Sequence, residues 1–146
     1  MTISIIHGVN LSHLGQREPE IYGSETLEDI NQGLQSDFPD VNFHFVQSDI
    51  EGELVQAIWK AARESQGIVL NPGGYTHTSV AIRDAVAAID VPVIEVHLTN
   101  LHAREPFRRE SLTAAVCWGQ IQGFGALSYH LAVRALIERV ARASRP

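Results

Sequence analysis

Glu95 and His97 are the two residues whose types and spacing best suit proton transfer. They lie in an apolar run over residues 91–98, and the two-residue period of a strand places both side chains on one face. A carboxylate beside an imidazole fixes the tautomer of the ring and favours its protonated form. The pair is therefore typical of a general acid, the alternative being a structural pair that satisfies a sheet edge.

Residues 8–25 hold a second candidate group, which includes Arg17 and Tyr22. The stretch is longer than the ~2–6 residues that usually join a strand to a helix, and long loops in compact domains are often active-site lids. A tyrosine side chain has a reference pKa of ~10 and is a poor base at neutral pH, but a nearby guanidinium stabilises its phenolate. We expect a lid that carries a base, the alternative being a solvated loop on which the ring of Tyr22 only packs.

The elements that position these residues alternate between short apolar runs and longer helical patterns. Strands are expected over residues 3–7, 41–46, 67–71, 91–98 and 115–123, and helices over 26–36, 51–65, 79–88 and 126–143, with residues 100–111 irregular. Strict alternation with apolar strands predicts an α/β fold, in which helices cover both faces of a parallel sheet. Five strands suit the flavodoxin-like order 2-1-3-4-5, as one catalytic domain over residues 1–146 with the lid at 8–25.

This topology predicts where chemistry takes place, because ligands bind beyond the carboxyl ends of parallel strands. Polar side chains that rarely enter a core unpaired follow the first, third and fourth strands: Asn10, Arg17, Tyr22, Asn71, His77, Thr99, Asn100, Arg104 and Arg108. The turn after the third strand also holds Gly73 and Gly74. Arg104 and Arg108 are four residues apart and would share one face of a helix. They would bind a carboxylate or several hydroxyls, the alternative being a solvated charged face.

Composition excludes several other classes. The formal net charge of -6 argues against a duplex nucleic acid partner, which needs a basic surface. The single cysteine, Cys117, forms neither an internal disulfide nor a Cys-rich zinc site, and its apolar neighbours predict a buried small side chain. Lys60 is the only lysine and falls within a helical pattern, which argues against a Schiff base. We expect a cytoplasmic protein, because neither a membrane span nor a secretory signal is evident.

Two further function classes stay open on the residues alone. A metal-dependent hydrolase or lyase would use histidines such as His77, His97 and His102, although no pair has the spacing of a metal site on one helix. A flavodoxin-like binding module for a flavin or a phosphoryl switch is the other, although a switch needs an acidic cluster after the first strand, where this chain has residues 7–10, HGVN.

Four segments carry a resemblance to a known family, and they follow one another along most of the chain: NLSHLGQREPEIYG at 10–23, QSDIEGEL at 47–54, NPGGYTHTSVAIRDA at 71–85 and EVHLTNLHAREPFR at 95–108. They resemble the type II 3-dehydroquinate dehydratases, which have the flavodoxin-like fold. The resemblance implies a hydro-lyase that reversibly converts 3-dehydroquinate to 3-dehydroshikimate without metal or cofactor, in aromatic biosynthesis or quinate breakdown. It also implies a homo-oligomer, a dodecamer built from trimers.

The resemblance also implies roles. Tyr22 would take a proton from the carbon next to the ketone, Arg17 would hold Tyr22 as phenolate, and His97, oriented by Glu95, would protonate the departing hydroxyl. Polar groups and water near Asn10 and Asn71 would steady the enolate. The substrate would be held by Asn71, Gly73, His77, Asp84, Leu98, Thr99 and Arg108, with Arg104 supporting the lid. His77 and Asp84 are seven residues apart, which on one helix means ~10 Å along the axis. We therefore expect Asp84 to serve the site of a neighbouring subunit.

The chain departs from the family pattern at a few positions near these residues. His7 and Val9 stand where asparagine and proline are usual, and Ser12 replaces a common asparagine. Pro106 stands where glutamate is usual and Glu110 where histidine is usual, while Thr99 replaces serine and keeps the hydroxyl. None of these changes removes a group to which a chemical role is given above.

Overall fold

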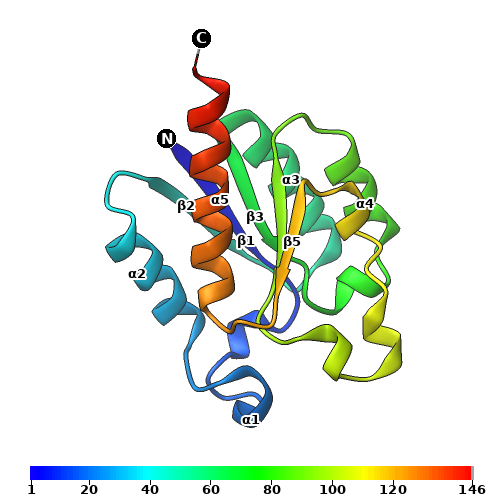
Figure 1. Cartoon of the computed structure of the whole chain (residues 1–146). Coiled ribbons are helices and arrows are strands. Elements are labelled where there is room, and N and C mark those ends of the chain that lie inside the picture. The colour runs from blue at the N-terminus through cyan, green and yellow to red at the C-terminus, as the bar shows by residue number, and fades with distance from the viewer. Residues whose placement is uncertain (146) are drawn as a thin grey trace.

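A five-stranded parallel sheet in the order β2-β1-β3-β4-β5 forms the centre of the computed structural model, which describes residues 1–145 (Figure 1). The strands are β1 (Thr2–His7), β2 (Asn42–Gln47), β3 (Gly67–Asn71), β4 (Val93–His97) and β5 (Gly119–Gln122). The predicted fold class and strand order are confirmed. The carboxyl ends of β1, β3 and β4 meet at one edge of the sheet, and the functional residues were expected there.

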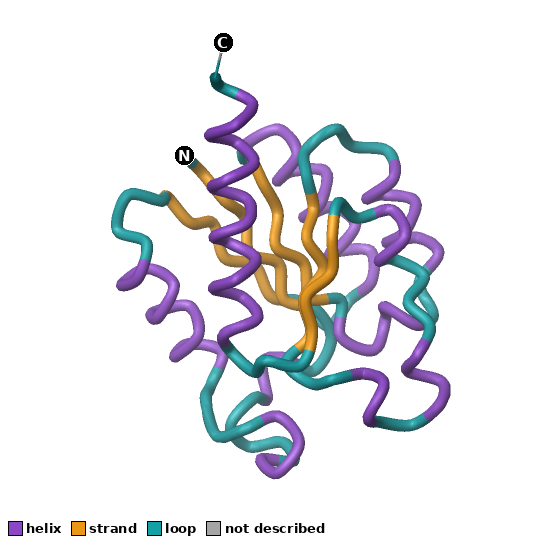
Figure 2. The backbone as a smooth tube through the Cα atoms, in the orientation of Figure 1, coloured by secondary structure: helices purple, strands orange, loops and turns teal. Residues whose placement is uncertain are grey.

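Helices cover both faces of the sheet (Figure 2). The longer ones are α2 (Leu27–Asp37), α3 (Glu51–Glu64), α4 (Val80–Ala87) and α5 (Leu127–Ala143). One core cluster joins α2 and α5 to the sheet and the other joins α3 and α4 to it. Because successive strand residues point to opposite faces, Ile5 of β1 enters the first cluster and Ile6 enters the second.

The connection between β1 and α2 contains two short helices, η1 (Leu11–His13) and α1 (Pro19–Tyr22). Figure 1 shows α1 beyond the carboxyl ends of the strands. A capping box then begins α2: Asp29 donates its backbone N–H to the Thr26 hydroxyl, and the Asp29 carboxylate accepts from the backbone N–H of Thr26. The predicted start of this helix is therefore confirmed, and it anchors the far end of the expected lid.

Two expectations about residues that share a helix are wrong. His77 belongs to a separate 3-10 helix, η2 (Gly73–His77), and the Ser79 hydroxyl caps α4, so His77 and Asp84 do not share one helix. Arg104 and Arg108 do not share a helix either, because η3 (Leu101–Ala103) ends before Arg104, and Pro106 begins η4 (Pro106–Arg109). The proline fits a first helical position but would interrupt a longer helix.

The last strand is also shorter than predicted. Residues 115–117 do not pair with the sheet, because the chain first forms η5 (Ala114–Val116). Strand pairing begins when Trp118 donates its backbone N–H to the Val93 carbonyl. Cys117 is half-buried rather than buried, and burial raises the pKa of its thiol to about 12, which makes it a poor nucleophile. Within residues 1–145 no helix has the length and apolar character that a bilayer crossing requires.

Candidate active site

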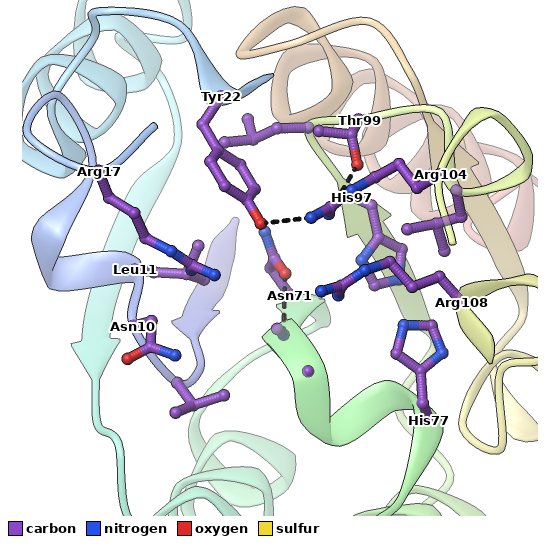
Figure 3. Close-up of a pocket in the computed structure, with 15 residues that line it drawn as sticks. Asn10, Leu11, Arg17, Tyr22, Asn71, His77, His97, Thr99, Arg104 and Arg108 are labelled. Carbon is purple, nitrogen blue, oxygen red and sulfur yellow. Dashed lines mark hydrogen bonds between the residues drawn. The ribbon is translucent and has the colours of Figure 1, made fainter. Parts of the chain in front are cut away.

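A pocket opens at the carboxyl edge of the sheet, between the β1–α2 connection and the segment after β4 (Figure 3). Eleven of the thirteen predicted site residues line it: Asn10, Arg17, Tyr22, Asn71, Gly73, His77, His97, Leu98, Thr99, Arg104 and Arg108. Val9 adds apolar wall to the pocket, as do Leu11 and Leu101, which the sequence did not single out. The structure thus brings together residues from three chain segments that the strand-end rule predicted to meet.

Tyr22 lies between two guanidinium groups. Its hydroxyl accepts a hydrogen bond from Arg104 Nη2 at 2.9 Å, and the same arginine lies 3.4 Å from Thr99 Oγ1. The guanidinium carbon of Arg17 lies 4.7 Å from the centroid of the Tyr22 ring. Both cations lie against the tyrosine, but Arg104 is the one that contacts its oxygen. The sequence suggested Arg17 for this position because it is nearer in the chain.

His97 is buried and bonds through Nε2 to Glu95 Oε2 at 3.0 Å, as the two-residue spacing on one strand face predicts. Glu95 is fully buried behind it and does not line the pocket. With Nε2 bound to the carboxylate, Nδ1 is the ring nitrogen left for a ligand.

Four further side chains hold the Glu95 carboxylate: Thr76, Ser111, Thr113 and Gln120 all donate to it. Burial alone would raise the pKa of Glu95, but the hydrogen bonds from His97, Thr113 and Gln120 and the attraction to His97 outweigh burial and lower that pKa to about 2. Glu95 is therefore ionised at neutral pH, and its charge lies against the His97 ring. Sequence reasoning missed these four residues, because nothing in their spacing links them to Glu95.

A close approach of two backbone segments forms the floor of the pocket. Gly73 has a φ of 64°, and a Cβ there would lie 2.7 Å from the Val9 carbonyl oxygen, so only glycine fits. The Gly73 N–H donates to Asn71 Oδ1 at 3.0 Å and fixes that amide. Asn10 has a φ of 67°, and its backbone N–H donates to Asp49 Oδ1 at 2.8 Å. Asp49 was not predicted to take part.

His77 and Arg108 close the side of the pocket opposite the lid. His77 Nδ1 bonds to the Glu110 carbonyl oxygen at 2.7 Å, and Arg108 Nε bonds to Glu105 Oε2 at 2.9 Å. Because His77 uses the backbone of residue 110, the unusual side chain there leaves this contact intact.

Besides Glu95, Asp84 is the one predicted site residue that does not line this pocket. It lies on α4 with an exposed side chain. Within residues 1–145 no three His, Cys, Asp or Glu side chains gather as a metal site would require, and His102 lies outside the pocket.

Comparisons with known proteins agree with this geometry. Residues 1–137 match a family model described as dehydroquinase class II. The 3-dehydroquinate dehydratase of Pelodictyon phaeoclathratiforme is 52% identical over 139 residues, which cover 94% of this chain and 92% of that protein. That of Jannaschia sp. is 48% identical and both chains are covered completely. The crystal structure of a type II dehydroquinase from Butyrivibrio crossotus superimposes with a TM-score of 0.91 at 41% identity, over 93% of this chain and 97% of that one.

Proposed function

The chain belongs to the class II dehydroquinase family and has 3-dehydroquinate dehydratase activity, and on this premise we propose how its residues divide the hydro-lyase reaction. Tyr22, as phenolate, removes a proton from the carbon next to the ketone, and the electron pair of that C–H bond forms an enolate. His97 then donates a proton to the departing hydroxyl as the enolate collapses. Water leaves and a conjugated enone remains. The observation that carries the assignment is a tyrosine held by two arginines across one pocket from a His–Glu pair.

The proposed base and the proposed acid have different neighbours. The guanidinium groups of Arg104 and Arg17 flank Tyr22, whereas the ionised Glu95 bonds to His97. The proposal therefore gives proton removal to Tyr22 and proton donation to His97. The enolate oxygen lies near Asn10 and Asn71, whose amides steady it directly or through water.

The other pocket residues bind the substrate in this proposal. The carboxylate of the substrate binds the backbone of Leu98 and the hydroxyl of Thr99, and His77 and Arg108 bind the hydroxyls of its ring. Gly73 has no side chain and so lets the backbone approach the substrate closely. Residues 8–25 act as the lid of a single catalytic domain that spans the chain. The position of α1 beyond the strand ends supports the lid, because closing it over the pocket would bring Tyr22 and Arg17 onto the substrate.

The proposed reaction needs neither a metal nor a covalent imine. Lys60 lies on α3 and does not line the pocket. We expect purified protein given 3-dehydroquinate to produce the absorbance of the conjugated enone at the same rate with and without EDTA. Borohydride added with substrate should leave the protein mass unchanged. An adduct on Lys60, or a rate that EDTA abolishes and a divalent ion restores, would contradict this mechanism.

We also propose that the active form is a homo-oligomer, a dodecamer built from trimers. The exposed position of Asp84, outside the pocket of its own chain, supports a role in the site of a neighbouring subunit. The family resemblance of the segment that contains Asp84 supports it as well. Sedimentation of the active enzyme would measure the assembly. The cytoplasmic location stays a prediction, to be tested by cell fractionation.

Subunit mixing tests the role of Asp84. Tyr22→Phe and Asp84→Ala assemblies should each be weakly active alone. After the two chains are unfolded and refolded together, some sites combine an intact Tyr22 with a neighbour's intact Asp84, and activity should partly return.

The matched control mixes Tyr22→Phe with His97→Ala, because both residues line the pocket of their own chain and mixing cannot unite them. No recovery in verified mixed assemblies of the first pair would show that Asp84 acts within its own chain or only structurally.

A further inference from the structure

His7 is a fully buried histidine to which the proposed reaction assigns no role. It is the last residue of β1, and its backbone pairs with Asn71, the last residue of β3, so the two side chains emerge on the same face of the sheet. That face is covered by α2 and α5, which contribute Asn31 and Tyr129. Four polar side chains therefore meet in an otherwise apolar layer.

The hydrogen bonds among them run in one direction only. The backbone N–H of Gly73 can only donate, so Asn71 Oδ1 is its acceptor and Asn71 Nδ2 is the atom 2.9 Å from the Tyr129 hydroxyl. The hydroxyl oxygen accepts from that amide, so its proton goes to His7 Nδ1, at 3.1 Å.

His7 Nδ1 must then be unprotonated. The ring proton lies on Nε2 and donates to Asn31 Oδ1, at 2.9 Å. The neutral tautomer of His7 that carries its proton on Nε2 thus fits all four hydrogen bonds of this network.

The burial of both rings supports this assignment. Burial lowers the pKa of His7 to about 4, against a smaller opposite effect of the bond to Asn31, so the imidazole is neutral at physiological pH. Burial raises the pKa of Tyr129 above its usual range, so its hydroxyl keeps the proton that it donates. Among the described side chains, no buried polar atom lacks a hydrogen-bond partner.

We propose that His7 is a positioning residue that acts on the active site through Tyr129. The imidazole holds the Tyr129 hydroxyl as an acceptor for Asn71 Nδ2, while Gly73 holds the amide oxygen, so Asn71 presents an N–H to the substrate and never its oxygen. Figure 3 shows the Asn71 amide inside the pocket, with its oxygen directed to the turn at Gly73. This inference rests on the proposed role of Asn71 as a substrate-binding residue.

A double-mutant cycle between Tyr129→Phe and Asn71→Ala tests the relay. Tyr129→Phe removes one hydroxyl and should lower kcat/KM about tenfold, the effect of one lost orienting hydrogen bond. In the Asn71→Ala background the same change should have almost no effect, because no amide is left to orient. Additive losses would overturn the relay. If Asn71→Ala alone left kcat and KM unchanged, the role of Asn71 in the proposed function would fail instead.

Two substitutions of His7 separate positioning from folding. Asparagine places its amide near the position of Nδ1 and keeps a partner for Tyr129, whereas glutamine reaches the position of Nε2 and keeps the bond to Asn31. We expect His7→Asn to retain a higher kcat/KM than His7→Gln at comparable thermal stability; the reverse order would overturn the proposal. Ser4→Ala is the matched control, because Ser4 lies on the same strand as His7 and the substitution removes a buried hydrogen bond to Ser65. It should change thermal stability without changing kcat/KM.

The tautomer can be measured in the unsubstituted protein, which removes any dependence on variants that fold. In ¹⁵N-histidine-labelled protein at neutral pH, the signals of His7 should be those of a neutral ring protonated at Nε2. A ring protonated at Nδ1, or an imidazolium, would overturn the relay whatever Asn71 does.

Discussion

Replacing Tyr22 with phenylalanine should lower kcat by roughly 10²–10⁴-fold, the usual contribution of a positioned general base, while the fold and substrate binding persist. Only the oxygen that Arg104 contacts is removed, and the ring keeps its packing against the core and its position beneath Arg17. Initial rates of enone formation measure the loss, and calorimetric titration with 3-dehydroquinate measures binding.

A near-normal rate in Tyr22→Phe would mean that another group is the base. Tyr75→Phe is the matched control, because it also removes one phenolic hydroxyl, bonded to the Asp49 carbonyl, and Tyr75 does not line the pocket. Arg17→Ala should also cut turnover severely, because one of the two cations beside the phenolate is lost. Arg104 shares this role in the structure, so Arg104→Ala should reduce kcat as well.

The layers and strand order followed from the sequence because they rest on repeated signals. Buried residues such as Leu54, Ile58 and Ala61 recur at helical spacing on one face of α3, and β3 is apolar up to Asn71. Each strand that a helix follows adds the same evidence for a parallel sheet. The errors fall between β3 and β5, where the chain forms short 3-10 helices that no apolar period marks, one of them beginning at Pro106.

The pocket could be predicted because strand ends converge at one edge, but the pairing inside it could not. Arg17 and Arg104 are both near Tyr22, and only the three-dimensional path of the chain decides that Arg104 meets the hydroxyl. The donors to Glu95 likewise come from residues 76–120, and none has a distinctive spacing. Chemistry that follows from one strand, as in Glu95 and His97, was visible in sequence, whereas chemistry that joins distant segments was not.

Removal of the His97 side chain should separate the two halves of the reaction. In His97→Ala the base and its arginines are intact, so the proton next to the ketone is still removed and returned. The departing hydroxyl lacks its proton donor, and product formation should fall by roughly 10²–10⁴-fold. In heavy water, deuterium should therefore enter the substrate at that carbon faster than enone appears, which NMR of recovered 3-dehydroquinate would measure.

The control for this experiment is His102→Ala, which removes an exposed histidine five residues further along the same segment and outside the pocket; it should exchange and dehydrate as the unsubstituted enzyme does. Because the pKa of Glu95 is about 2, its carboxylate is charged at any pH near neutrality, and without the His97 ring that buried charge loses a hydrogen-bond partner. His97→Ala should therefore also unfold at a lower temperature than His102→Ala. Equal loss of exchange and dehydration would show that His97 does not act as the acid, and that Glu95 serves to orient a ring with another task.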